Sequence, residues 1–134
     1  MSTTYGANYA DTVDEAFVRK TCPKELAAFE KAKEDVDIFP GESMAFDDAL
    51  DNHSDVLEEA QYRACKEAYG KLLSEFKKKT GLTLMLATHD SENNGCKGDE
   101  ISGEFWSVDG VWQLTKAGKK YKRQITRQYF VTFG

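Results

Sequence analysis

The sequence is poor in the residues and patterns that mark several classes of protein. Its 134 residues include only three cysteines and two histidines. No apolar run approaches the roughly 18 residues that a membrane-spanning helix requires. Three widely spaced cysteines make a poor disulfide framework, and residues 1–10 have neither the basic nor the apolar part of a secretory signal. We therefore expect one soluble domain in the reducing environment of the cytoplasm.

Motifs that carry catalysis or metal binding are also missing. The chain has no Cys-x-x-Cys or His-x-x-x-His pair for zinc, no Gly-rich phosphate loop and no Gly-x-Ser-x-Gly nucleophile elbow. His89 and Cys96 are close enough in sequence to form a nucleophile pair, which would define a small hydrolase-like enzyme. Nothing in the sequence supplies a third group to orient them. We accordingly expect no enzymatic activity, no cofactor and no resident metal.

The loop over residues 90–100 permits one alternative, a cation site. Its acidic residues partly follow the register of a calcium-binding loop, but Ile101 stands where the bidentate Glu should be, which excludes an EF-hand. The alternative to a plain hairpin loop is a looser cation site, whose ligands would be Asp90, Glu92, Asp99 and Glu100.

Helical patterns dominate the first 40 residues after a polar start. Residues 1–10 are expected to form a flexible N-terminal arm. Thr12 with Glu15 matches a capping box, so a helix is expected to begin there. Cys22-Pro23 interrupts and restarts this helix, and Pro40-Gly41 is expected to end it.

Two more helices are predicted before residue 81. Ser43 can cap a short helix. The longest helix is expected from about Asp55 to Lys79, because apolar residues recur there at steps of three or four. Gly81 is expected to end it in the left-handed conformation.

After Gly81 the pattern changes to that of strands joined by tight turns. Four strands are predicted, over 82–88, 101–108, 111–114 and 121–133, with Asp109-Gly110 as a hairpin turn. A sheet with one apolar face needs cover, and the helices have apolar stripes to offer. The prediction is a single α+β domain: an arm (1–10), a helical part (11–80), and a sheet part (81–134). The N-terminal helices would pack on one face of a C-terminal four-stranded antiparallel meander.

The net charge of -5 is the sum of two opposed blocks. Residues 1–70 hold 16 acidic and 7 basic residues, whereas residues 71–134 hold 7 acidic and 11 basic ones. From Glu34 to Glu59 there is no Lys or Arg, and from Val111 to Gly134 there is no Asp or Glu. Such segregation shapes the electric field outside the protein and therefore its choice of partner.

The acidic stretch is a candidate docking face for a basic partner. Its alternative is a plain solvated helical surface. Its ten members are Glu34, Asp35, Asp37, Glu42, Asp47, Asp48, Asp51, Asp55, Glu58 and Glu59.

The basic stretch is a candidate nucleic-acid interface, because basic residues with an interleaved aromatic can hold phosphates and stack on bases. Its alternative is an edge strand whose charges discourage edge-to-edge pairing. The residues are Lys116, Lys119, Lys120, Tyr121, Lys122, Arg123 and Arg127.

Aromatic residues are concentrated in the last thirty positions, and alternation along strands must leave some of them on the open face of the sheet. Exposed aromatics on a sheet often form a contact surface. The candidates for this surface are Phe105, Trp106, Trp112 and Tyr129.

Together these patterns favour a small intracellular protein that binds a larger protein or nucleoprotein, as an inhibitor or adaptor does, and not a membrane. A small accessory protein of a phage or mobile element fits this profile. The first alternative is a nucleic-acid binder that uses the basic stretch. The second is the enzyme centred on His89 and Cys96.

Overall fold

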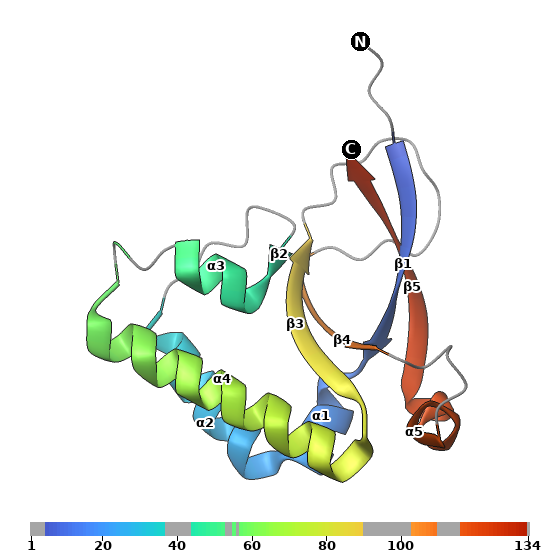
Figure 1. The fold of residues 1–134 in the computed structure, drawn as a ribbon, viewed down its shortest axis with the longest axis horizontal. Coiled ribbons are helices and arrows are strands. Elements are labelled where there is room, and N and C mark those ends of the chain that lie inside the picture. Colours follow the sequence, from blue (N-terminus) through green and yellow to red (C-terminus); the bar gives the residue numbers. More distant parts are fainter. Residues whose placement is uncertain are drawn as a thin grey trace.

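The computed structural model describes residues 5–36, 44–52, 55, 57–89, 103–109 and 116–133. The elements in chain order are β1 (Tyr5–Val13), α1 (Glu15–Thr21), α2 (Pro23–Glu34), β2 (Met44–Ala45), α3 (Phe46–Asn52), α4 (Glu59–Thr80), β3 (Thr83–His89), β4 (Gly103–Asp109), α5 (Lys116–Lys120), the 3-10 helix η2 (Lys122–Gln124) and β5 (Ile125–Phe133). Helices α1, α2 and α4 gather beside an antiparallel sheet, as Figure 1 shows. The fold class is therefore α+β, as the sequence predicted.

Among the described residues the sheet has five strands, in the order β2-β3-β4-β1-β5. Strands β3 and β4 pair along their whole length, and so do β1 and β5. Between these two pairs the link is short, because β1 meets β4 only at Thr12↔Ser107 and Val13↔Trp106. Beyond this link β1 and β5 run together as a two-stranded ribbon, drawn in blue and red in Figure 1.

This topology corrects the expected C-terminal meander and the expected N-terminal arm. Residues 5–13 form β1, which lies between β4 and β5 in the sheet. Pairing with β5 satisfies the backbone N–H and C=O groups that the two strands turn toward each other, and Val13 is buried in the core. The expected capping box at Thr12 is also wrong, since Asp14 is the N-cap of α1. The Thr12 hydroxyl instead donates to the carbonyl oxygen of Thr126 across the strand pair, at 3.0 Å.

The segment before β5 also differs from the expectation. We expected a long strand from Tyr121, but α5 spans Lys116–Lys120, η2 spans Lys122–Gln124, and β5 begins only at Ile125. The side chains of Ala117 and Tyr121 pack against the hydrophobic core, which favours a helical turn over an extended strand here. The expected strand 111–114 lies outside the described residues.

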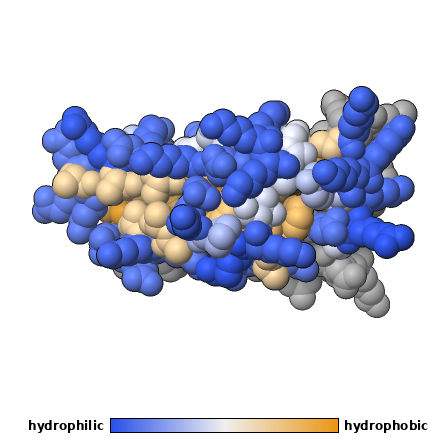
Figure 2. Space-filling view, turned by 90° about the horizontal axis from the view of Figure 1, so that it is seen from below, coloured by the Kyte–Doolittle hydropathy of each residue, from blue (hydrophilic) through white to orange (hydrophobic). Residues whose placement is uncertain are grey.

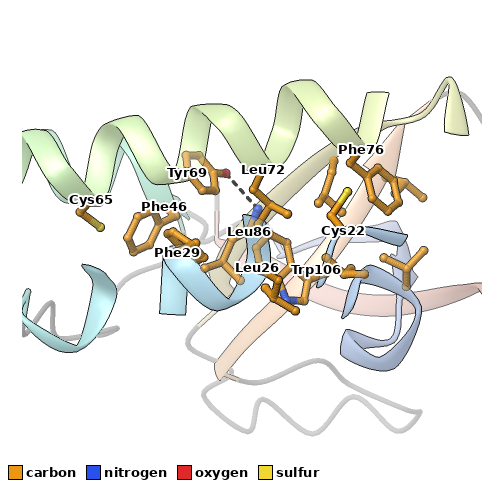
Figure 3. Close-up of a cluster of buried hydrophobic side chains, with 14 of the residues drawn as sticks. Cys22, Leu26, Phe29, Phe46, Cys65, Tyr69, Leu72, Phe76, Leu86 and Trp106 are labelled. Atoms are coloured by element: carbon orange, nitrogen blue, oxygen red, sulfur yellow. Dashed lines mark hydrogen bonds between the residues drawn. The ribbon is translucent and has the colours of Figure 1, made fainter. Parts of the chain in front are cut away.

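The core lies between the helices and one face of the sheet. Leu84 and Leu86 of β3 and Trp106 and Val108 of β4 turn toward the helices and are buried. Figure 3 shows the helical partners around them. These partners are Cys22, Leu26, Phe29, Phe46, Cys65, Tyr69, Leu72 and Phe76. Each fully buried large apolar side chain contributes about 1.5–3 kcal/mol by leaving water.

A buried hydroxyl links the longest helix to the sheet. The backbone N–H of Leu86 donates to the hydroxyl oxygen of Tyr69 at 3.0 Å, marked by the dashed line in Figure 3. Burial raises the pKa of Tyr69 to about 12, so its hydroxyl is uncharged at neutral pH. This bond satisfies a polar group of β3 within the apolar core.

Two of the sequence signals at helix ends are confirmed, whereas α2 ends at Glu34, before the expected stop at Pro40-Gly41, and α4 begins at Glu59 and not near Asp55. Pro23 stands at the first position of α2, as the Cys22-Pro23 pattern predicted. Gly81 ends α4 with φ at 79°, and its N–H donates to the carbonyl oxygen of Lys77 at 2.8 Å. A Cβ at position 81 would lie 3.0 Å from the Cβ of Ala117, so α5 packs closely on this end of α4.

Candidate functional site

The acidic and the basic segments of the sequence lie at opposite ends of the molecule in the fold. Helix α4 has 22 residues and so spans about 33 Å. In Figure 1 it runs along the helical layer, with α3 near its N-terminal end and α5 near its C-terminal end. Figure 2 shows hydrophilic side chains crowding both ends of the helical face, with a weakly apolar band between them toward the end that carries α3.

We call the surface around α3 and the start of α4 the acidic end. All of its described members are exposed. They are Glu34, Asp35, Asp47, Asp48, Asp51, Asp55, Glu58 and Glu59. Asp37 and Glu42, also predicted for this surface, lie outside the described residues.

Part of the acidic end is neutralised by the protein itself. Asp51 accepts hydrogen bonds from the Tyr62 hydroxyl and, at 2.9 Å, from the Lys66 ammonium. The Tyr62 bond and then the Lys66 bond lower the pKa of Asp51. Glu59 forms an ion pair with Arg63 at 2.7 Å. Two of the eight carboxylates therefore already have polar partners within the chain.

We call the opposite surface the basic end. Its members come from α1, the last turn of α4, α5 and η2, and all are exposed. They are Lys20, Lys77, Lys78, Lys79, Lys116, Lys119, Lys120, Lys122 and Arg123. Arg127, predicted with this group, lies in β5 directly opposite Asp11 of β1 and is set apart from it in the ribbon.

Tertiary contacts assemble the basic end from distant segments. The Lys79 ammonium donates to the carbonyl oxygen of Thr21 at 3.0 Å, which joins the ends of α1 and α4. The Tyr121 hydroxyl reaches the carbonyl oxygen of Lys79 at 3.5 Å, a long hydrogen bond that joins α4 to the segment after α5. Sequence reasoning missed Lys20 and Lys77–Lys79 as members of the basic end. The available signal was the run of three lysines just before a predicted helix stop.

An open cleft lies within the basic end. Its volume is about 590 Å³. One wall comes from α1 and the residue before it, and the other from the segment between α5 and β5. Its lining residues are Asp14, Ala16, Phe17, Lys20, Thr21, Tyr121, Arg123 and Gln124.

Two aromatic rings form the apolar part of this cleft. The rings of Phe17 and Tyr121 lie 5.6 Å apart between centroids, and both side chains are only partly buried. Behind them Phe17 meets Phe76 edge-on at 5.8 Å, so the pair is anchored in the core. The Lys120 ammonium lies 5.4 Å from the centre of the Tyr121 ring, within cation–π range.

The predicted aromatic sheet face is corrected at Trp106. Alternation along β4 turns this residue toward the helices, where it is 8% exposed and meets Phe29 at 5.9 Å between centroids. Phe105 points the other way and is half-buried, directly opposite Ala87 and on the same face of the sheet as Met85, which is 37% exposed. Trp112 lies outside the described residues, and so does the side chain of Tyr129. Phe105 is thus the one predicted member that the structure describes on this face.

The residues proposed for catalysis or cation binding fall mostly on segments that the structure does not describe. Cys96 and the loop 90–100 lie outside the described residues, as does the side chain of His89. Cys22 and Cys65 are fully buried, and burial raises the pKa of both thiols, that of Cys65 to about 11. A buried thiol of raised pKa is a poor nucleophile. Among the residues that the structure describes, no group of three or more His, Cys, Asp and Glu is placed to hold a metal ion.

Comparison with known proteins adds no relative. No protein-family model, curated sequence or solved structure matches this chain. Within the described part of the chain, no helix is both long and apolar enough to cross a membrane.

Proposed function

We propose that this protein is a non-enzymatic binding protein that holds a nucleic acid at its basic end. The observation that carries the proposal is that the basic end gathers nine exposed cations from four segments and contains a cleft with an aromatic wall, which two of those cations, Lys20 and Arg123, line. Cations hold the phosphate backbone, and aromatic rings next to them stack on bases. The function predicted second from the sequence therefore becomes the first candidate.

The acidic net charge does not oppose this function. The charges are segregated, and α4 alone separates the two ends by about 33 Å. At physiological ionic strength, interactions between exposed charges are screened beyond about 8 Å. A phosphate at the basic end therefore experiences mainly the charges of that end, where the nine cations outnumber the nearby carboxylates Asp14 and Glu75.

Salt dependence of binding tests the proposal. The measurement is the anisotropy of a labelled oligonucleotide titrated with the protein at several salt concentrations. Each neutralised phosphate contributes about 0.7 to the slope of log affinity against log salt for a single strand. The triple variant Lys116→Gln, Lys119→Gln, Lys120→Gln is therefore expected to lower that slope by about 2.

A matched triple variant provides the control. Lys31→Gln, Arg63→Gln, Lys71→Gln removes the same charge from α2 and α4 outside the basic end. It is expected to leave the slope of log affinity against log salt nearly unchanged. Absence of binding at low salt would contradict the proposal, and so would an equal decrease of this slope in the two triple variants.

The acidic end supports a second candidate, the docking of a basic protein as an inhibitor or adaptor would do. The favouring observation is that all eight described carboxylates of this end are exposed. The test is capture of a partner by the wild-type chain and by the variant Asp47→Asn, Asp48→Asn, Asp55→Asn. This candidate requires a basic protein that salt releases and that the variant fails to hold. Equal capture by both chains would refute it.

A further inference from the structure

We infer that the cleft between α1 and the segment 121–124 is a subsite for one unpaired nucleotide, so that the protein prefers single-stranded nucleic acid to duplex. This inference rests on the proposed function and names the substrate class of the same surface. Its basis is the combination of volume, aromatic wall and polar lining at one place.

The volume suits a nucleotide. At about 590 Å³ the cleft lies within the range of roughly 300–1,000 Å³ that is typical of small-ligand sites. A double helix is far too wide to enter such a space. A single base that has left its stack can enter it while its neighbours remain on the surface.

The aromatic wall is held in place before any ligand arrives. Phe17 is fixed from behind by Phe76, and Tyr121 is fixed by Phe17 and by the backbone of Lys79. Both rings nevertheless keep part of their surface toward the cleft. A preorganised ring loses little conformational freedom when a base stacks on it. Stacking on a protein aromatic contributes about 1–3 kcal/mol per base.

The polar lining complements the other parts of a nucleotide. Lys20 and Arg123 offer cations to a phosphate, while the Asp14 carboxylate can accept hydrogen bonds from a base and the Gln124 amide can both donate and accept. Asp14 is the N-cap of α1, yet its side chain makes no capping hydrogen bond. These groups suit the hydrogen-bonding edge of a base, which is occupied in a duplex and available in a single strand.

The surrounding cations extend the site along a strand. The basic end extends beyond the cleft lining to Lys77–Lys79 in the last turn of α4 and to Lys116 and Lys119 of α5. Phosphates before and after the inserted nucleotide would meet these side chains. The cleft makes the protein prefer single strands, and the remaining cations bind the phosphates of single-stranded and duplex nucleic acid alike.

The test compares single-stranded and duplex oligonucleotides of equal length with Tyr121→Leu and Tyr121→Phe. Tyr121→Leu removes the ring and is expected to lower single-strand affinity about tenfold or more, with duplex affinity nearly unchanged. Tyr121→Phe keeps the ring and should retain the preference for single strands. Oligo-dT and oligo-U are both expected to show the loss, because stacking does not involve the sugar.

A second variant covers the case in which Tyr121→Leu folds poorly. Gln124 is exposed, so Gln124→Leu is expected to fold as the wild type does, which circular dichroism checks. It should reduce binding of single strands by several-fold and leave duplex binding unchanged.

The outcomes separate this inference from the proposed function. Equal affinity for single strands and duplex in the wild type contradicts the subsite while the nucleic-acid function stands. A Tyr121→Leu chain that is folded and binds single strands like the wild type contradicts it too. Absence of binding to either nucleic acid at low salt contradicts the function itself, and the subsite with it.

Discussion

The acidic and basic ends are built alike, with an aromatic cluster beneath a charged surface, but the clusters differ in burial. Under the acidic end, Phe29, Phe46 and Tyr69 lie 5.1–5.3 Å apart between centroids and are at most 5% exposed. Under the basic end, Phe17 and Tyr121 are only partly buried and line a cleft. The first cluster is closed within the core, where it holds α2 and α3 against α4 and joins these helices to the sheet. In the second cluster, part of the ring surface of Phe17 and Tyr121 stays accessible next to the cations of the basic end. A ligand with both apolar and anionic parts could bind there.

The largest expected effect tests this difference in burial. Phe46→Ala should lower the free energy of unfolding by about 3–5 kcal/mol, because it opens a cavity in a closed cluster. Tyr121→Leu should cost clearly less, since its ring is partly exposed and leucine keeps some of the contact. Urea denaturation measures both. An equal cost would mean that Tyr121 belongs to the core, and the contrast between the two ends would be lost.

The next effect concerns the hydroxyl that ties the acidic-end cluster to the sheet. Tyr69→Phe should cost about 1–3 kcal/mol, because the N–H of Leu86 loses its partner in a buried place. Urea denaturation measures the cost, and amide exchange at Leu86 should become faster.

The same hydroxyl predicts a pH dependence in alkali. The folded-state pKa of Tyr69 is raised from 10.0 to about 12, so its stabilising effect is complete below pH 10 and is lost as the pH rises toward 12. This loss should be smaller in Tyr69→Phe. A wild type and variant with parallel stability curves above pH 10 would contradict the assignment.

The sequence predicted an element of the fold correctly where the residues that determine it are close together in the chain. Pro23 and Gly81 act within one or two turns, so the start of α2 and the stop of α4 that they predicted were confirmed, whereas α4 begins four residues after the predicted Asp55. The identity of β1 was set by β5, whose residues lie more than a hundred positions away, and its own sequence is polar. A polar segment with no local strand pattern was therefore mistaken for an arm.

For the candidate site, too, the features set by neighbouring residues could be predicted, and those set by distant contacts could not. The charge blocks were visible in the sequence, but the joining of Lys79 to Thr21 spans 58 positions and no local pattern announces it. Trp106 was misplaced because alternation defines two faces without saying which one the helices cover. The register decides this, since Leu86 pairs with Trp106 and both turn to the core.

A smaller effect tests how the basic end is held on α4. Gly81→Ala should destabilise by about 1–2 kcal/mol, because its left-handed backbone disfavours a Cβ. The new Cβ would also press on Ala117 and disturb α5. The control is Gly70→Ala on the same helix, where nothing lies within 4 Å, and it should stabilise by up to about 1 kcal/mol. Thermal melts measure the stability of both variants. A Gly81→Ala variant with the same melting temperature as the wild type would contradict the packing of α5 on α4.

The smallest effect lies at the acidic end and depends on pH. Because the pKa of Asp51 is lowered in the folded state, its contribution is present above the ordinary aspartate value and is lost as the pH falls below it. The difference in melting temperature between wild type and Asp51→Asn should therefore shrink on acidification. Asp48→Asn makes the same charge change on the same helix and is the control. If both variants follow the same pH curve, the Asp51–Tyr62–Lys66 contacts do not stabilise the fold.

Amide chemical-shift mapping with a short single-stranded oligonucleotide tests the central claim, that the basic end and not the acidic end meets a nucleic acid. We expect the largest shifts at residues 17–21, 77–81 and 116–124, around the cleft and the end of α4. The amides of α3 and of the first turns of α4 should remain unchanged. Shifts confined to α3 and residues 58–63, or no shifts at low salt, would contradict it.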